Sequence, residues 1–287
     1  MKEYKFTWEF LNTCPICDHD VAVPNGKISY LKQDFWYVVC VQCNTKYMNP
    51  RPTKSSYDEF YENYFWEEVF ANNRFRIEGQ IWNYESKGLE KEYQWKNEKV
   101  NRDTVVGEKE MKEKLERLRI KDIENILTYN LNISNKTSIL EVGAGIGVTL
   151  NHFQNKYNSK VYAIEPSNEA RRIMSENNNI KIIGKFAEEL ENLSLKKENY
   201  DCIIFAHSLE NTLNPVKNIL DAANILNKNG CILVQCSNLF TFDQMNPYHP
   251  FIFSFQSFKY FKNKKNFSIK RFGKETDRML NVVIKND

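Results

Sequence analysis

Apolar runs of strand length recur through the second half of the chain, and several are separated by stretches with apolar residues at helical spacing. These runs begin at positions 139, 161, 181, 201, 231, 267 and 279. Parallel strands that are buried on both faces give near-continuous apolar runs of this kind, and alternation with helical patterns is typical of strand–helix–strand units. We therefore expect residues 131–287 to form an α/β domain built on a seven-stranded sheet.

Residue types at the expected helix ends predict some boundaries in this domain. Ser167 is a good amino-terminal cap for a helix that runs to about Asn177. Asn214 and Pro215 are typical of a helix start, and the pair Asn229–Gly230 is typical of a helix end.

Residues 53–130 contain few glycines and prolines and many Glu, Lys and aromatic residues, which indicates a helical connector. Its last part has an approximate apolar stripe on a strongly charged helix, formed by Met111, Leu115, Leu118, Ile123, Ile126 and Leu127. Its first part is rich in rings: Tyr57, Phe60, Tyr61, Tyr64, Phe65 and Trp66. Packing against the sheet is the simpler explanation of these rings, and covering a ligand pocket is the alternative.

Four cysteines near the amino terminus form two C-x2-C pairs: Cys14, Cys17, Cys40 and Cys43. The spacing between the two pairs is slightly longer than the spacing of about 15 to 20 residues that is usual in zinc ribbons. Four thiolates complete a closed tetrahedral Zn²⁺ site, so the expected role is structural. We expect residues 1–52 to form this ribbon, with strands at 28–31 and 35–39. The remaining cysteines lie in apolar runs and are expected to be buried, inert thiols: Cys202, Cys231 and Cys236.

Composition and charge narrow the class of protein. The 287 residues are 41% hydrophobic and 27% charged, as in soluble globular proteins. No apolar run approaches the about 18 residues of a membrane span and no secretion signal is present, so we expect a cytoplasmic location. The net charge of +3 is too small to indicate nucleic-acid binding across the whole surface. Residues 259–274 contain Lys and Arg but no acid, which indicates a solvated face or, alternatively, a site for an anionic substrate.

The glycine-rich turn after the first strand of the domain indicates a nucleoside-bearing cofactor. Its glycines are spaced G-x-G-x-G, whereas the dinucleotide fingerprint has G-x-G-x-x-G, and Glu141 lies two positions before the first glycine. In this the sequence resembles the class I S-adenosylmethionine (SAM) methyltransferases. The resemblance implies a Rossmann-like seven-stranded methyltransferase sheet, with SAM as cofactor and S-adenosylhomocysteine (SAH) as product. It also implies that the amino-acid end of SAM lies beside Glu141, Gly143, Ala144, Gly145 and Gly147.

Three later positions extend the expected SAM site. Glu165 ends the second strand at roughly the 20-residue spacing at which a carboxylate binds the ribose hydroxyls, and Pro166 beside it is also expected to contact the cofactor. The alternative is that this carboxylate only begins the helix that follows Pro166. The resemblance places Ala187–Glu188 beside the adenine, and it places Ala206–His207, after the fourth strand, near the methionine end of SAM.

Residues that could remove a proton from the methyl acceptor lie in two loops. The sequence from His207 to Glu210 matches the first four positions of the H-x-L-E-H pattern common in related enzymes. Asn211 replaces the second histidine, which removes one candidate base. His249 follows the fifth strand, where related enzymes place a histidine facing the acceptor. The expected catalytic residues are therefore His249, Glu210 and His207, and they are needed only if the acceptor is a neutral hydroxyl rather than an anion.

The segment CPIC…CVQCNTKYMNPRPT, which begins at Cys14, is similar to the zinc-binding segment that precedes many bacterial methyltransferases acting on sugars or surface-polysaccharide precursors. This resemblance implies a small acceptor, anionic or nucleotide-linked, and no DNA partner. Some zinc-bearing sugar C-methyltransferases have a further carboxy-terminal domain, for which the expected sheet leaves no residues. O-methylation is therefore slightly favoured over C-methylation.

Two other functions stay open. An RNA methyltransferase would use the ribbon and residues 259–274 to hold phosphates, although the low net charge and the lack of a recognisable RNA-binding module speak against RNA as a partner. A non-catalytic SAM-binding protein would fit the missing histidine at position 211. Aromatic residues among the lysines of 251–267 could also contact a membrane surface, but a lid over the acceptor explains them equally well.

Overall fold

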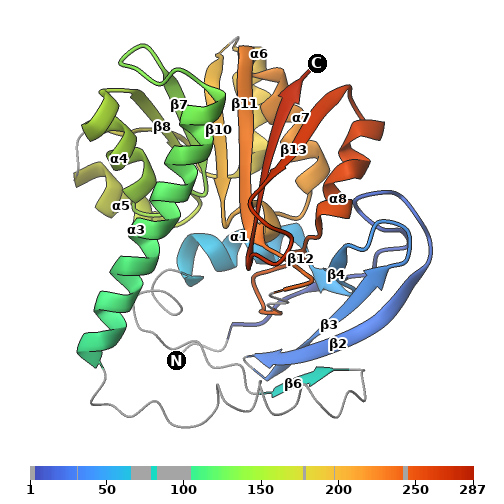
Figure 1. Ribbon diagram of the computed structural model, residues 1–287. Coiled ribbons are helices and arrows are strands. Elements are labelled where there is room, and N and C mark those ends of the chain that lie inside the picture. The colour runs from blue at the N-terminus through green and yellow to red at the C-terminus, as the bar shows by residue number, and fades with distance from the viewer. Residues whose placement is uncertain are drawn as a thin grey trace.

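The computed structural model describes residues 4–30, 32–65, 79–82, 105–176, 179–196, 198–241 and 245–287. It contains a seven-stranded sheet with helices on both faces and, at one end of this sheet, a five-stranded sheet formed mainly by the amino-terminal residues (Figure 1). The helix α1 (Lys54–Asn63) lies between the two sheets (Figure 1).

The large sheet has the strand order β13-β14-β11-β10-β7-β8-β9. Its strands are β7 (Ser138–Val142), β8 (Lys160–Ile164), β9 (Lys181–Gly184), β10 (Tyr200–Ala206), β11 (Leu226–Ser237), β13 (Phe267–Phe272) and β14 (Met279–Asn286). The strands β7 to β11 are parallel, and β14 is antiparallel to both of its neighbours. This confirms the seven strands predicted from the sequence. The order reverses between β7 and β10, and ligands of open α/β sheets bind beyond the carboxyl ends of the strands at such a point.

The large sheet is covered on both faces. In β10, Cys202 and Ile204 pack on the side of α3, α4 and α5, whereas Ile203 and Phe205 pack on the side of α6, α7 and α8. This burial on both faces explains the continuous apolar runs in the sequence. The helices are α3 (Val105–Asn130), α4 (Val148–Tyr157), α5 (Asn168–Glu176), α6 (Leu190–Leu195), α7 (Pro215–Asn224) and α8 (Phe255–Lys259). The three cysteines predicted to be inert are fully buried: Cys202, Cys231 and Cys236.

Two predicted helix starts are confirmed. The hydroxyl oxygen of Ser167 accepts a hydrogen bond from the backbone N–H of Ala170 at 3.2 Å, and α5 begins at the next residue after this cap. The helix α7 begins at Pro215, although the side chain of Asn214 makes no capping hydrogen bond.

The pair Asn229–Gly230 does not end a helix, contrary to the prediction. The helix α7 ends at Asn224, and β11 has already begun at Leu226. The pairing of β11 with β10 shifts register in this part of the strand, and Asn229 has a left-handed backbone with φ of 67°. Asn and Gly tolerate this conformation in a β-bulge as well as at a helix end. The local sequence therefore fits both structures, and pairing with β10 decides between them.

The amino-terminal sheet includes a strand from the other end of the chain. Its order is β12-β4-β3-β2-β6, with β2 (Ala22–Tyr30), β3 (Gln33–Cys40), β4 (Lys46–Met48), β6 (Gly79–Trp82) and β12 (Phe251–Ile252). The strands β1 (Trp8–Glu9) and β5 (Arg51–Pro52) form a separate short pair. The two strands predicted for the ribbon are present as β2 and β3. Because β12 pairs with β4, the predicted ribbon and the large domain share a sheet, and a boundary at residue 52 stays a prediction.

The predicted connector is helical at both ends but not throughout. The strand β6 lies within it and pairs with β2, so the helical interpretation is wrong at residues 79–82. Among the described side chains of the apolar stripe, Ile123 and Leu127 are fully buried, whereas Leu118 is 50% exposed. Trp66 and the side chains of Met111 and Leu115 lie outside the described residues. Within the described part of the chain, no helix has the length and apolarity needed to cross a membrane.

Candidate active site and metal centre

The glycine turn joins β7 to α4 in a conformation that needs glycine. Gly143 and Gly147 have φ of 76° and 79°, in the left-handed region that disfavours residues with a side chain. A Cβ atom at Gly143 would lie 2.5 Å from the Cβ atom of Ser208, which closes off any larger residue there. Gly147 is the residue immediately before α4, so the first backbone N–H groups of that helix face the turn.

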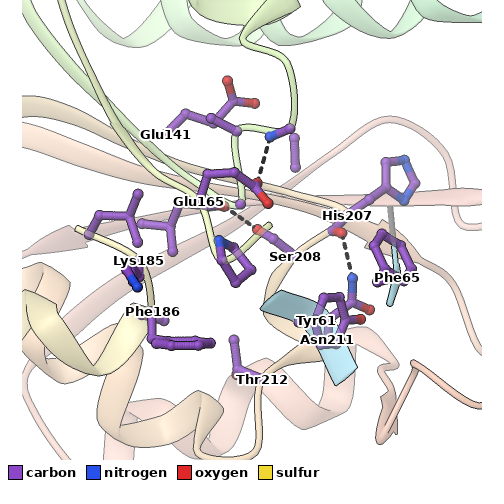
Figure 2. Close-up of a pocket in the computed structure, with 18 of the residues that line it drawn as sticks. Tyr61, Phe65, Glu141, Glu165, Lys185, Phe186, His207, Ser208, Asn211 and Thr212 are labelled. Carbon is purple, nitrogen blue, oxygen red and sulfur yellow. Dashed lines mark hydrogen bonds between the residues drawn. The ribbon is translucent and has the colours of Figure 1, made fainter. Parts of the chain in front are cut away.

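The carboxylate of Glu165, at the end of β8, is held against this turn. Its Oε2 atom accepts a hydrogen bond from the N–H of Gly145 at 2.7 Å (Figure 2). Its Oε1 atom accepts one from the N–H of Ser167 at 2.8 Å. Burial raises the pKa of this carboxyl, while the two N–H donors oppose the shift. The side chain is thus fixed in position with lone pairs left for a ligand.

A cavity of about 250 Å³ opens over the turn at the carboxyl ends of the strands. It brings together nearly all of the residues predicted for the cofactor: Glu141, Gly143, Ala144, Gly145, Glu165, Pro166, Ala187, Glu188, Ala206 and His207. Gly147 is the exception, because it turns the chain into α4 instead of lining the cavity. The predicted cofactor residues therefore form one continuous surface.

The cavity is also lined by residues that were not predicted as site residues. Tyr57, Tyr61 and Phe65 come from α1 and the residues just after it, which supports the interpretation of the ring-rich segment as a cover. Glu116 and Arg119 come from α3, and no sequence pattern indicates them, because a charged helix face is usually exposed to solvent.

Ion pairs connect α1 to the loops around the cavity. The Nζ atom of Lys185 lies 2.6 Å from the carboxylate of Glu62, and the guanidinium of Arg171 lies 3.7 Å from the same carboxylate. At the other end of the helix, the Nζ atom of Lys54 lies 3.8 Å from the carboxylate of Glu188. The cover therefore contacts the helix α5, which follows β8, and the segment that follows β9.

Glu141 is a buried carboxyl at the inner end of the cavity. Burial raises its pKa to about 8, while the positive charge of Arg119 opposes the shift. Its Oε2 atom has no hydrogen-bond partner among the described residues. Buried polar atoms are nearly always paired in folded proteins, so this oxygen is available for a donor from a bound molecule.

The loop after β10 places two of the three candidate catalytic residues together. The Nδ1 atom of His207 lies 3.5 Å from the carboxylate of Glu210. His207 lines the cavity, whereas Glu210 lies behind it, is 1% exposed, and has no hydrogen-bond partner for either oxygen in the described part of the chain. Asn211 stands where the H-x-L-E-H pattern has its second histidine. Its Nδ2 atom donates to the backbone oxygen of His207 at 3.0 Å, so this amide stabilises the loop (Figure 2).

The third candidate, His249, is buried in the loop before β12 and is not among the residues that line the cavity. Asn246 Oδ1 accepts a hydrogen bond from the N–H of Tyr248, which turns the Nδ2 atom of the same amide toward His249 Nδ1, 2.8 Å away. Because the amide nitrogen of Asn246 donates to Nδ1, Nδ1 carries no proton, and the proton of a neutral His249 is on Nε2.

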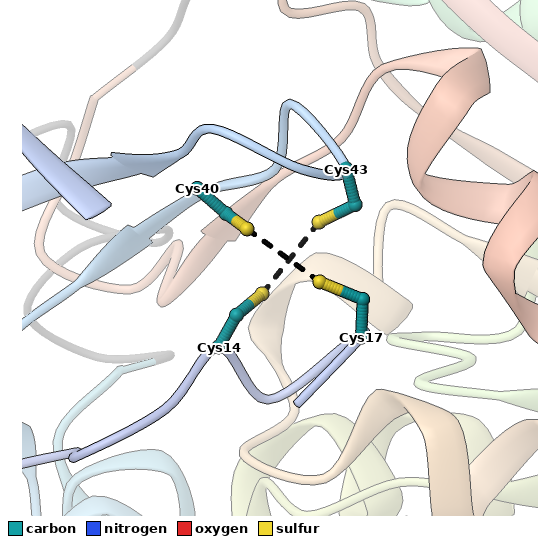
Figure 3. A group of neighbouring side chains, drawn as sticks. All are labelled: Cys14, Cys17, Cys40 and Cys43. Atoms are coloured by element: carbon teal, nitrogen blue, oxygen red, sulfur yellow. Dashed lines mark hydrogen bonds between the residues drawn. The ribbon is translucent and has the colours of Figure 1, made fainter. Parts of the chain in front are cut away.

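The four predicted metal ligands form one cluster. The Sγ atoms of Cys14, Cys17, Cys40 and Cys43 all lie within 4.8 Å of one another (Figure 3). The Cys14–Cys43 and Cys17–Cys40 sulfur distances are 3.6 and 3.5 Å. Sulfurs about 2.3 Å from a tetrahedral Zn²⁺ ion would have closely similar separations, so the donor set fits zinc. His19 is not part of the cluster.

Both cysteine pairs are bent in the same way. The N–H of Asp18 bonds to the oxygen of Cys14, and the N–H of Asn44 bonds to the oxygen of Cys40, at 2.9 and 3.0 Å. Asp18 and Asn44 each follow the second cysteine of their pair and each have a left-handed backbone, which Asp and Asn tolerate better than most residues. Local residue choice thus shapes both halves of the site.

Residues 108–265, more than half of the chain, match the sequence family described as "Methyltransferase domain". Similar solved structures include a SAM-dependent methyltransferase from Aquifex aeolicus (16% identity, 58% of this chain and 91% of that one, TM-score 0.46). Another is the CcbJ methyltransferase from Streptomyces caelestis (13% identity, 52% of this chain and 83% of that one, TM-score 0.44). A third is the plantazolicin methyltransferase BpumL in complex with SAH (18% identity, 53% of this chain and 76% of that one, TM-score 0.44). No curated protein matches the chain closely enough in sequence to be counted as a relative. By its sequence match, the chain belongs to the methyltransferase-domain family.

Proposed function

We propose that the protein transfers the methyl group of SAM to a small nucleotide-linked or sugar-derived precursor of surface polysaccharide, with oxygen slightly favoured over carbon as the acceptor atom. The acceptor class comes from the resemblance of the cysteine-rich segment to those of sugar-modifying methyltransferases. A small acceptor is in keeping with a cavity of about 250 Å³.

The observation that carries this proposal is the aromatic cover of the cavity. The hydroxyls of Tyr57 and Tyr61 both donate to the backbone oxygen of Tyr248, at 2.8 and 3.1 Å, which ties α1 to the loop after β11. Phe65 packs edge-on against the Tyr248 ring, with 5.1 Å between the ring centres. A covered site suits a small molecule better than a polymer, and it keeps water from the reacting atoms.

In the proposed complex, Glu165 binds the ribose hydroxyls, Ala187–Glu188 flank the adenine, and Glu141 with the glycine turn surrounds the amino-acid end. Bound SAM supplies an electrophilic methyl group for an in-line displacement. The protein then contributes mainly alignment of the acceptor and exclusion of water.

If the acceptor is a hydroxyl, its proton must be removed, and we assign this step to His207 together with Glu210. His207 reaches the cavity, and the buried carboxylate 3.5 Å from its Nδ1 atom would stabilise the imidazolium that forms. A catalytic role for His249 stays a prediction, because this side chain is not among the described residues that line the cavity. An acceptor that is already anionic would need none of this proton transfer.

We propose no nucleic-acid partner, because much of the basic segment is engaged within the protein. Lys264 pairs with Asp18 beside the metal ligands, and Lys265 donates to Asn224 at 3.0 Å. The ammonium of Lys270 lies 4.9 Å from the centre of the Tyr129 ring. These contacts favour a solvated face that stabilises the fold over a surface reserved for phosphates.

The proposal is tested by a search for the acceptor. Protein and methyl-labelled SAM are incubated with fractionated extract of the source cells at a limiting SAM concentration, with Glu165→Ala protein as the control that should transfer much less label. Label in an anionic small-molecule fraction is expected, and its mass identifies the acceptor. Label in RNA would overturn the acceptor assignment, and no transfer by protein that still binds SAH would favour a non-catalytic SAM-binding role.

We further propose that the four cysteines hold a structural Zn²⁺ ion. The closed set of four thiolates leaves no position for a substrate. Metal analysis of the purified protein should give about one zinc per chain, and Cys43→Ser protein should give much less.

A further inference from the structure

The charged side chains that line the cavity are mostly acidic. Among the described residues, five carboxyl groups line it: Asp58, Glu116, Glu141, Glu165 and Glu188. Apart from the histidine, the cations among them are Lys185 and Arg119. Burial raises the pKa of Glu141 and of Glu165, but the carboxylates outnumber the cations even when both of these carboxyls are protonated.

Each of the two cations already faces a carboxylate. The Nζ atom of Lys185 lies 2.6 Å from the carboxylate of Glu62 in α1. The guanidinium of Arg119 lies 3.8 Å from the carboxylate of Glu116, and its positive charge also acts on Glu141. An anionic group that entered the cavity would therefore have to compete with a carboxylate for either cation.

The charges just outside the lining do not change this balance. Lys54 is paired with Asp58 and lies 3.8 Å from Glu188, so one ammonium serves two carboxylates. The buried carboxyl group of Glu210 lies behind His207. SAM carries one net positive charge, from a sulfonium, an ammonium and a carboxylate. With SAM bound and His207 neutral, as a base must be, the cavity has no excess of positive charge.

The polar side chains that follow His207 in its loop are neutral. Asn211 and Thr212 line the cavity from this loop, and Tyr57 and Tyr61 line it from α1 (Figure 2). Amide and hydroxyl groups can hydrogen-bond to other hydroxyls, but they carry no charge that would balance a phosphate or a carboxylate. These surroundings suit an uncharged, hydroxyl-bearing part of an acceptor.

We propose that the methyl acceptor is a neutral hydroxyl group, and that any phosphate or carboxylate of the acceptor molecule stays outside the cavity. This inference rests on the proposed function and excludes the anionic acceptor atom that the sequence left open. The hydroxyl oxygen forms a bond to the methyl carbon while the carbon–sulfur bond breaks, and the electron pair of that bond stays on sulfur. The hydroxyl proton passes to Nε2 of His207, whose Nδ1 atom lies 3.5 Å from the carboxylate of Glu210.

The first test identifies the bond that holds the transferred methyl group. Protein and methyl-labelled SAM are incubated with extract of the source cells, and the labelled product is treated with mild alkali or with phosphatase and phosphodiesterase. The expected methyl ether releases no labelled methanol in either treatment, and hydriodic acid converts its label to methyl iodide. Methanol released by alkali, from a carboxylic ester, or by the phosphoesterases, from a phosphoric ester, would overturn the inference. So would label that hydriodic acid does not release.

This result is read separately from the class of acceptor. A methyl ether found in RNA would overturn the surface-polysaccharide acceptor and still support a neutral hydroxyl. Small molecules that release labelled methanol would support a small acceptor and overturn the neutral hydroxyl.

The second test removes the proposed proton acceptor. With the same extract, His207→Gln should lower turnover by about 100-fold or more, while calorimetry gives an unchanged affinity for SAH. His152→Gln is the matched control, because His152 lies on α4 and is not among the described residues that line the cavity. It should keep full turnover. Unchanged turnover of the His207→Gln protein would mean that no proton has to be removed, and it would overturn the inference.

Discussion

The hydroxyl of Tyr37, in the amino-terminal sheet, lies 2.8 Å from the backbone oxygen of His249, a residue of the methyltransferase half of the chain. The same hydroxyl lies 2.7 Å from the backbone oxygen of Asn246. The N–H of Met48 donates to the oxygen of Pro250 at 2.9 Å, and β12 follows directly. The loop that holds a candidate catalytic residue is thus fixed largely by the cysteine-rich part of the protein.

Tyr37→Phe should loosen this loop without changing the cofactor site. The substitution keeps the buried ring and removes one hydrogen bond, a loss of about 0.5 to 1.5 kcal/mol. Hydrogen exchange of the amides at 245–253 should become faster, while the affinity for SAH stays the same. Tyr47→Phe is the control, because Tyr47 is equally buried in the neighbouring strand and no bond from its hydroxyl to the loop is found in the described part of the chain. Equal exchange in both variants would contradict the prediction.

Loss of the metal should spread from the cysteines to the same loop. The cysteines and Tyr47 belong to one apolar core with Phe251 and Phe253, and β4 pairs with β12. Cys40→Ser, or treatment with a chelator, should therefore lower the melting temperature and speed hydrogen exchange at Phe251–Ile252 before it affects β7 or β8. Cys236→Ala, which alters a buried thiol outside the cluster, should keep the full metal content.

Glu165→Ala should weaken SAH binding by about 1 to 3 kcal/mol, because it removes the proposed ribose acceptor and leaves two backbone N–H groups without their partner. 5′-Methylthioadenosine, which retains the ribose but lacks the amino-acid end of SAM, should lose affinity to the same extent. Glu169→Ala, on the exposed face of α5, serves as the control. Unchanged affinity in calorimetry would refute the ribose assignment.

The parts of the site that could be predicted from the sequence are those set by neighbouring residues. The glycine turn, Glu165 and the two cysteine pairs each depend on backbone conformation or spacing within a few residues, so their types and order are informative. The burial of β10 on both faces of the sheet also follows from its continuous apolar run alone.

The remaining parts depend on contacts between distant segments. The two-residue strand β12 has no pattern of its own and exists because it pairs with β4. Arg119 could not be recognised, because only the position of α3 over the cavity separates it from exposed arginines such as Arg117. His249 was found by resemblance, but its hydrogen bond with Asn246, which sets its protonated nitrogen, needed the folded loop.

Glu141→Gln should stabilise the ligand-free protein at alkaline pH. Arg119, Thr149 and Glu165 face this carboxyl from α3, α4 and the end of β8, and burial dominates, raising its pKa from 4.5 to about 8. Below about pH 4.5 the carboxyl is protonated in the folded and unfolded chains alike. Between pH 4.5 and 8 the unfolded chain binds fewer protons than the folded one, so the free energy of unfolding falls as pH rises.

Each unit of pKa shift corresponds to about 1.4 kcal/mol. In thermal unfolding without ligand, the free energy of unfolding of the Glu141→Gln protein should therefore exceed that of the parent protein by up to a few kcal/mol at pH 8, and the two should not differ for this reason near pH 4.5. A difference between Glu141→Gln and parent that does not change with pH would mean that the carboxyl ionises normally in the folded protein.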